Sequence, residues 1–163
     1  MTQKITILCV GSLKEAYWRD AAAEYAKRLG RFAAVDIVEV AEKKLPANAG
    51  ASDEQIVVEA ESRLLAGKIV RSPRTLVAAL DIAGKPMTSP DFASWLSDRA
   101  SYGKTDIVFL IGGSLGLSEE LLRQADVCIS FSSMTFPHQL MRVILLEQLY
   151  RAMKINRNEP YHK

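Results

Sequence analysis

The sequence predicts an α/β fold with a mainly parallel sheet and helices on both faces. Two observations lead to it. Short apolar runs rich in β-branched residues recur along the chain, and segments with helical spacing of apolar residues separate them. Strands that alternate with helices pair in parallel, and the helices then cover both faces of the sheet. The length of 163 residues, 48% of them hydrophobic and 25% charged, fits one domain over residues 1–163.

The expected elements follow from these patterns in chain order. Five apolar runs are expected to be strands, at residues 5–10, 34–40, 75–80, 106–111 and 126–131. Helices are expected between and after them, at residues 14–29, 52–67, 89–101, 118–125 and 137–153.

Two of these helices carry clear boundary signals. The helix at 52–67 opens with Ser52 followed by acidic residues and closes on Gly67. Ser118 is expected to cap the next-to-last helix, whose first turn holds two glutamates. The stretch "KKLPANAGAS" (43–52) is the most loop-like part of the chain.

The last helix and the segment before it are unusually apolar. In "FSSMTFPHQLMR" (131–142) small hydroxyl residues and apolar residues run without a break from strand to helix. One interpretation is structural: Thr135 or Phe136 caps the helix, Pro137 lies in its first turn, and the apolar residues belong to the core. The other is a ligand pocket with apolar walls whose backbone groups read the edge of a base.

The helix itself is apolar nearly all round, which is typical of a helix buried on more than one side. Either the domain encloses it or it forms a dimer interface. Two charged residues, Arg142 and Glu147, interrupt it. Arg142 either belongs to a structural ion pair or points into a pocket.

Glycines follow two of the expected strands. Gly84 lies in "LDIAGKP", and Gly112, Gly113 and Gly116 lie in "LIGGSLGLSEE". Glycines past a strand let a ligand approach the backbone, and in parallel sheets ligands bind at the carboxyl edge. No phosphate-binding glycine motif is present, and the acidic turn that follows would repel a phosphate. A ligand with adenine and amino-acid portions fits this pattern, and ordinary tight turns fit it equally well.

Composition excludes other classes. No stretch approaches the roughly 20 apolar residues of a membrane helix. The amino terminus reads as a strand without a signal peptide, so a cytoplasmic location is expected. The two cysteines, Cys9 and Cys128, are expected to be buried thiols. With two histidines and no CxxC, no metal site is expected.

Positive charge is concentrated in two runs, although the net charge is only +2. Residues 63–74 hold four basic residues and no acid, and residues 151–163 hold five basic side chains against one glutamate. A solvated face explains each run. Because one chain holds two such runs, an RNA-binding surface is an alternative hypothesis.

Four segments together resemble one family. "LDIAGKP", "LIGGSLGLS", "SSMTFPHQLMRVILLEQLYRA" and the terminal "NEPYHK" are similar to the bacterial ribosomal RNA large subunit methyltransferase H family, small SPOUT enzymes consisting of little more than a catalytic domain. The resemblance covers the whole chain. It implies a SPOUT-type α/β knot, a C-terminal trefoil knot over about residues 75–163 in which the last helix is threaded. Such knots are rare exceptions among folds.

The resemblance also implies a function. Members transfer the methyl group of S-adenosylmethionine to N3 of a pseudouridine in a stem-loop of 23S ribosomal RNA within the assembled ribosome. Each site of the homodimer is completed by the partner's C-terminal tail. By resemblance, the cofactor would contact Leu80, Gly112, Phe131, Ser132, Ser133, Met134, Thr135 and Phe136.

The tail and the last helix would supply the catalytic and RNA-binding residues. His162 is the candidate general base because its pKa range lies near neutrality, although water or hydroxide is an alternative base, with His162 then orienting the RNA. Arg142 would stabilise negative charge on the flanking carbonyl oxygens. The full expected set is catalytic His162, Arg142 and Tyr161, with Lys154, Arg157 and Lys163 on RNA phosphates. Many members end in Arg where this chain has Lys163, so the bidentate fork is lost here.

Two alternative functions remain open on the sequence. A SPOUT methyltransferase acting on transfer RNA keeps the fold, but no appended RNA-binding domain is present. A non-enzymatic, nucleotide-binding regulator with a flavodoxin-like fold would use the apolar junction to hold a ring.

Overall fold

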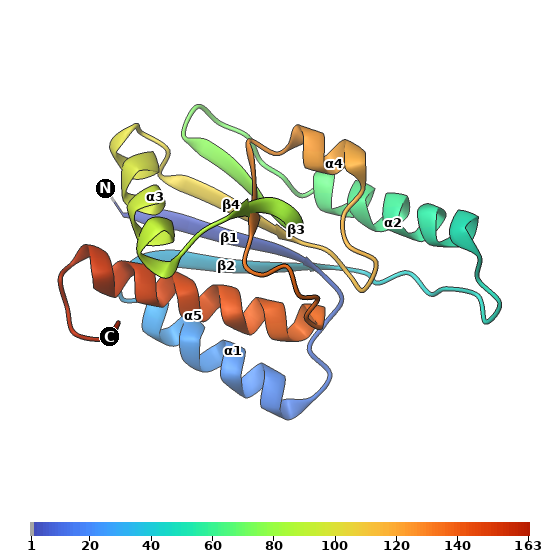
Figure 1. Cartoon of the computed structure of the whole chain (residues 1–163), viewed down its shortest axis with the longest axis horizontal. Coiled ribbons are helices and arrows are strands. Elements are labelled where there is room, and N and C mark those ends of the chain that lie inside the picture. Colours follow the sequence, from blue (N-terminus) through green and yellow to red (C-terminus); the bar gives the residue numbers. More distant parts are fainter. Residues whose placement is uncertain (1) are drawn as a thin grey trace.

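A computed structural model describes residues 2–163 and contains a five-stranded sheet whose strand pairs are all parallel (Figure 1). The strand order is β2-β1-β4-β3-β5. This confirms the predicted α/β class and its parallel sheet. The strands are β1 (Gln3–Val10), β2 (Ala33–Val40), β3 (Thr75–Pro86), β4 (Asp106–Ile111) and β5 (Val127–Ser130).

Helices cover both faces of the sheet, as predicted (Figure 1). One face carries α1 (Ala16–Leu29), α3 (Ser89–Ser101) and α5 (His138–Asn156), and the other carries α2 (Ala51–Ala66) and α4 (Glu119–Gln124). Each face has its own apolar core, because alternate strand residues point to opposite sides. The larger core lies under α5, which packs between α1 and α3, while Leu140, Met141 and Ile144 of this helix stay only half-buried. The expected dimer interface on α5 stays a prediction.

The register brings the carboxyl ends of three strands to the same level. Val10 pairs with Val40, and Cys9 pairs with Ile111, so β1, β2 and β4 end together. Leu80 of β3 pairs with Ile129 of β5 close to the same edge. Loops that leave these strands must therefore meet, which is the placement expected for a ligand site.

β3 differs from its prediction because it does not end at Leu80. The glycine-containing segment "LDIAGKP", expected to be a loop, continues the strand to Pro86 through an irregularity, after which Lys85 pairs with Ile129. A Cβ on Gly84 would lie 2.8 Å from backbone atoms of Cys128 and Ile129. Gly84 is thus required because β3 and β5 approach closely there, not because of a turn.

Helix boundaries agree with the predictions to within a few residues. Ser118 accepts a hydrogen bond from the backbone N–H of Leu121 at 3.2 Å and caps α4 as expected. The structural interpretation of the junction is wrong about the start of α5: Pro137, rather than Thr135 or Phe136, holds the N-cap position, and no side chain caps the helix. α2 begins at Ala51, and Asp53 accepts from the N–H of Gly50 at 3.0 Å.

Both cysteines are free thiols. Cys9 is buried as predicted, and this burial raises its pKa to about 11. Cys128 is only half-buried. None of the helices in residues 2–163 is long and apolar enough to cross a membrane. The trefoil knot over about residues 75–163 stays a prediction.

The close approach at Gly84 gives a stability prediction. Gly84→Ala places a methyl group against backbone atoms that cannot rotate away, so we expect it to lower the free energy of unfolding by about 1–3 kcal/mol. Gly50→Ala is the matched control, since nothing lies within 4 Å of its added Cβ. Urea unfolding midpoints of the two variants measure the difference. Equal midpoints would contradict the close contact.

Candidate functional site

Three chain segments enclose a cavity of about 690 Å³ at the carboxyl edge of the sheet. They are the end of the first part of β3, the glycine loop after β4 (residues 112–116) and the junction between β5 and α5 (residues 131–137). We call this space the glycine-loop cavity; its volume is in the range of small-molecule sites. It is lined by all but one of the residues expected for the cofactor: Leu80, Gly112, Phe131, Ser132, Met134, Thr135 and Phe136. Ser133 is exposed and is not among the lining residues.

The glycine loop is folded tightly on itself. A Cβ on Gly112 would lie 2.5 Å from the carbonyl carbon of Gly116, and Gly113 and Gly116 form an antiparallel bridge. Gly116 has a φ of +81°, which a residue with a side chain rarely adopts. The glycines therefore allow the loop to close on itself, and the whole loop from Gly112 to Gly116 lines the cavity.

The junction is apolar because it serves the core and the cavity together. The ring of Phe131 packs edge-on against Phe92 of α3 with 5.5 Å between ring centroids. The Ser130 hydroxyl donates to the carbonyl of Ser132 at 3.0 Å, and the hydroxyl of Ser132 accepts from the N–H of Met134 at 2.9 Å. These contacts fix the shape of a segment that would otherwise be an irregular loop. Phe131 thus packs against the core and lines the cavity at once, and the ligand-pocket interpretation of the junction stays a prediction.

Charge in the glycine-loop cavity is sparse. Asp81 and His138 are the ionisable residues of its lining, and no lysine or arginine is among them. Asp81 also accepts from the N–H of Ala83 at 3.1 Å. A cavity with a carboxylate, apolar walls and no cation suits a neutral or positively charged ligand better than a phosphate. Within residues 2–163, no three His, Cys, Asp or Glu side chains gather as a metal ion would require.

Arg142 lies beneath this edge rather than in the lining of the glycine-loop cavity. Its side chain is only 4% exposed, and one terminal nitrogen contacts Oε2 of Glu39 at 2.6 Å. The other donates to the carbonyl of Gly11 at 3.1 Å, while Nε is buried without a partner in the described chain. A structural ion pair therefore exists, and it joins α5 to β2. The charge-stabilising role of Arg142 stays a prediction.

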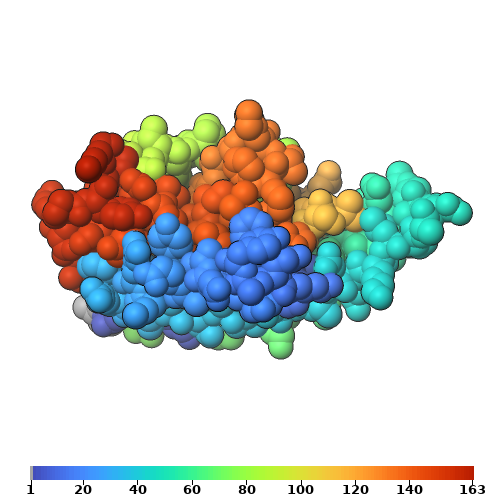
Figure 2. All heavy atoms as spheres, turned by 90° about the horizontal axis from the view of Figure 1, so that it is seen from below, coloured from blue at the N-terminus to red at the C-terminus, as the bar shows by residue number. Residues whose placement is uncertain are grey.

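The C-terminal tail packs on the far end of α5. The hydroxyl of Tyr161 donates to Oε1 of Glu147 at 3.0 Å, and burial raises the pKa of Tyr161 to about 12. Nδ1 of His162 lies 3.1 Å from a terminal nitrogen of Arg151. Arg151 is 10 positions after Met141, the last residue of α5 in the cavity lining, so His162 lies about 15 Å along the helix from the glycine-loop cavity. Figure 2 shows the red tail at one end of the molecule, away from the orange start of α5.

Two of the cations expected to bind RNA contact other groups of the same chain. Lys154 forms an ion pair with Glu159 at 2.5 Å, and the guanidinium of Arg157 lies 4.6 Å from the centre of the Phe32 ring. Lys163 is exposed. Their roles toward RNA stay predictions.

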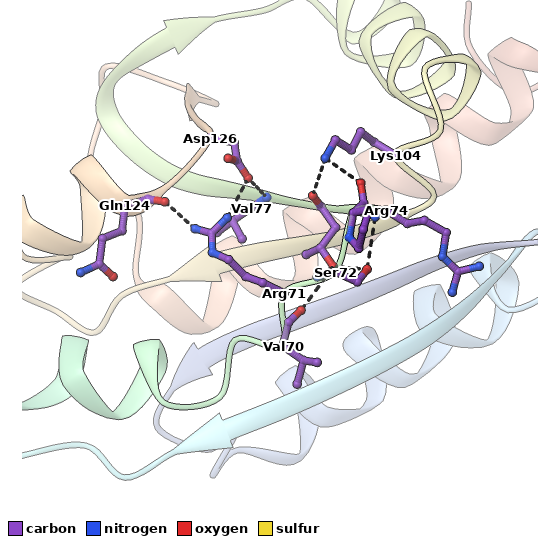
Figure 3. Close-up of polar contacts among 10 residues, drawn as sticks. Val70, Arg71, Ser72, Arg74, Val77, Lys104, Gln124 and Asp126 are labelled. Carbon is purple, nitrogen blue, oxygen red and sulfur yellow. Dashed lines mark hydrogen bonds and ion pairs between the residues drawn. The ribbon is translucent and has the colours of Figure 1, made fainter.

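The basic run at 63–74 also includes structural contacts (Figure 3). Arg71 contacts Asp126 at 3.3 Å and donates to the carbonyl of Gln124 at 2.5 Å, while Asp126 accepts from the N–H of Val77 at 2.7 Å. Lys104 donates to the carbonyl of Pro73 at 2.9 Å. These groups hold the chain around the start of β3, at the sheet edge opposite the glycine-loop cavity. Part of the run is therefore fold-stabilising.

Sequence reasoning missed several lining residues, notably Asp81, Ser114, Leu115 and His138. A signal was present for His138, because it directly follows the junction at a strand end. For the partnership of Arg142 with Glu39 no signal was present, because 103 positions separate them.

Comparisons with known proteins agree with one another. The family model described as "Predicted SPOUT methyltransferase" matches residues 3–162. A ribosomal RNA large subunit methyltransferase H from Exiguobacterium sp. (strain ATCC BAA-1283 / AT1b) is 52% identical over 159 residues, covering 98% of this chain and 99% of that protein. Among solved structures, a probable methylase family protein from Haemophilus influenzae Rd KW20 matches with a TM-score of 0.55 at 14% identity, covering 100% of this chain and 72% of that one. This last likeness concerns the fold alone.

The buried ion pair predicts different losses of stability when one or the other of its partners is replaced. Glu39→Ala leaves the buried guanidinium of Arg142 without its carboxylate, so we expect the free energy of unfolding to fall by about 3 kcal/mol. This value is at the lower end for a broken buried pair because 41% of the Glu39 side chain is exposed. Arg142→Met removes the buried charge and leaves a carboxylate that water reaches, so its loss should be smaller. Glu24→Ala, which breaks an exposed pair with Arg28, is the control and should change little. Thermal or urea unfolding ranks the three, and a larger loss for Arg142→Met would contradict the assignment.

Proposed function

The chain belongs to the SPOUT methyltransferase family and, within it, to the ribosomal RNA large subunit methyltransferase H family; from this premise, we propose that it methylates N3 of a pseudouridine in 23S ribosomal RNA of the assembled ribosome, with S-adenosylmethionine as the donor. This substrate implies a cytoplasmic location. The observation that carries the proposal is the glycine-loop cavity, because its lining comes from three of the segments that resemble the family.

The residues of the cavity fit this donor. S-adenosylmethionine, when bound, supplies an electrophilic methyl group on a positively charged sulfur. The backbone of the glycine loop and of the junction can hydrogen-bond an adenine edge, and Phe131 and Phe136 supply apolar walls. Asp81 supplies a negative charge in a lining without cations, which favours a sulfonium and disfavours a phosphate.

The position of the C-terminal tail supports a site shared between the two subunits of a homodimer. Tyr161 and His162 contact Glu147 and Arg151, which lie about 9 and 15 Å along α5 from Met141, the last residue of this helix in the lining of the glycine-loop cavity. A tail that takes part in methyl transfer must therefore move far within its chain or reach a second copy. We propose the second arrangement, with the tail of one subunit completing the cavity of the other.

In this arrangement the tail grips and orients the RNA. Exposed Lys163, with Lys154 and Arg157, would contact phosphates, and Tyr161 and His162 would position the target ring. Holding the acceptor nitrogen in line with the methyl group can itself supply several kcal/mol of the barrier. One assay distinguishes this proposal from its two alternatives, a transfer RNA substrate and a non-enzymatic regulator.

Methyl transfer is tested with labelled S-adenosylmethionine on assembled ribosomes that lack the modification, beside free transfer RNA. We expect label in 23S RNA of ribosomes alone. The variant Thr135→Arg, which fills the glycine-loop cavity from an exposed lining position, should abolish both donor binding and transfer. Ser133→Arg, one exposed position outside the lining, is the matched control and should keep donor affinity. Label only in transfer RNA would show that the substrate is wrong, and no donor binding would favour the regulator.

Mixed dimers test the shared site. His162→Ala should lower transfer without changing donor affinity, and Thr135→Arg should abolish donor binding. Mixing the two inactive variants creates dimers in which an intact cavity meets an intact tail from the other subunit, so transfer should return to about half the wild-type rate per mixed dimer. A tail that serves its own cavity predicts no recovery. Gel filtration of each variant checks that the dimers form.

A further inference from the structure

A second cavity of about 710 Å³ adjoins the glycine-loop cavity. It lies where β1 and β2 end, and its lining includes Gly11, Ser12, Glu39, Glu42 and Glu61. We call it the β1–β2 cavity. The two cavities share Ser114 and Leu115 of the glycine loop as lining residues. Methyl transfer needs two reactants in contact, and two adjoining cavities with a common wall provide that geometry.

The imidazole of His138 and the carboxylate of Glu42 both lie close to Gly11, near the wall that the two cavities share. His138 lines the glycine-loop cavity, and its Nε2 lies 3.5 Å from the point where a Cβ on Gly11 would stand. Oε2 of Glu42 lies 3.5 Å from the same point. Gly11 has a φ of +81° and is buried, so the space that a side chain would fill stays open between the two groups.

The charges around His138 favour its neutral form at neutral pH. Burial of the ring lowers the pKa of His138, Glu42 raises it, and the guanidinium of Arg142 lowers it. Glu39 neutralises that guanidinium from β2. The amino end of α5, where His138 lies, also disfavours a positive charge. A neutral imidazole at this boundary is able to accept a proton.

We propose that the β1–β2 cavity binds the acceptor uracil-type ring and that Nε2 of His138 accepts the proton of its imide nitrogen. The inference rests on the proposed function and deepens it. The lone pair of the acceptor nitrogen forms the new N–C bond, the C–S bond of the sulfonium donor breaks with its pair left on sulfur, and the imide proton passes to Nε2. Glu42 then stabilises the imidazolium. Lys14, Lys43 and Lys44 line the same cavity and suit the flanking phosphates.

This proposal divides the roles of the two histidines. His162 is exposed on the tail and beside Arg151, while His138 is half-buried, lines the glycine-loop cavity and has its Nε2 close to Gly11, which lines the β1–β2 cavity. We therefore assign proton transfer to His138 and RNA positioning to His162. The two roles differ in their dependence on pH, because a missing base can be replaced by ionisation of the imide in solution.

The test compares His138→Gln with His162→Gln in single-turnover methylation of ribosomes between pH 6 and 9, with saturating S-adenosylmethionine. His138→Gln should lose about a hundredfold or more in rate at pH 7 when the donor is saturating. Its deficit should shrink about tenfold per pH unit, since the imide anion becomes more abundant. His162→Gln should show a deficit that is constant with pH. A wild-type rate or a constant deficit in His138→Gln would overturn the inference.

A second measurement needs no RNA. The chain has two histidines, so proton NMR of the imidazoles resolves both, and His138→Gln assigns them. Because Glu42 raises the pKa of His138, Glu42→Gln should lower it. An unmoved His138 pKa would overturn the pairing with Glu42. If wild-type protein labels no ribosome while this titration behaves as expected, the proposed substrate fails and the histidine–carboxylate pair stands.

Discussion

The buried guanidinium of Arg142 ties the amino end of α5 to the carboxyl ends of β1 and β2, and both cavities depend on that junction. Its partners, Glu39 and the carbonyl of Gly11, are 103 and 131 positions away in sequence. A buried charge is costly unless it is paired, so α5 cannot slide along the sheet edge without stranding it. The same contact sets the height of His138, one helical turn before Arg142, between the two cavities.

The second constraint on the site is that two of its positions must be glycine. Gly112 allows the glycine loop to close on Gly116, and Gly11 leaves room between His138 and Glu42. In both places the absence of a Cβ keeps backbone close to a position where a ligand would lie. Rigid strands end below these loops, so the backbone groups are held in place without the loops having to be ordered by the ligand. Preorganisation of this kind reduces the cost of binding.

Local pattern predicted most of the fold, because helical and strand periodicity depends on neighbours along the chain. It failed where pairing is distant: "LDIAGKP" has the composition of a turn, yet pairing with β5 makes it strand. The segments that line the glycine-loop cavity were predictable because parallel strands bring their carboxyl ends to one edge. The β1–β2 cavity was not, since Glu42 lies in an apparent loop and meets His138 only after α5 has docked. Family resemblance added the reaction, which periodicity alone does not specify.

The position of α5 in the chain has a consequence for biosynthesis. This helix fills the space between α1 and α3 over the larger core, yet it is made after every strand that it covers. Until it emerges, the core on that face is covered only by α1 and α3, which lie on either side of the space that α5 fills. Translation proceeds at about 5–20 residues per second, so the nascent chain carries an open apolar surface for several seconds. Apolar surface exposed in this way favours aggregation during synthesis, and the stability of the finished protein does not remove that hazard.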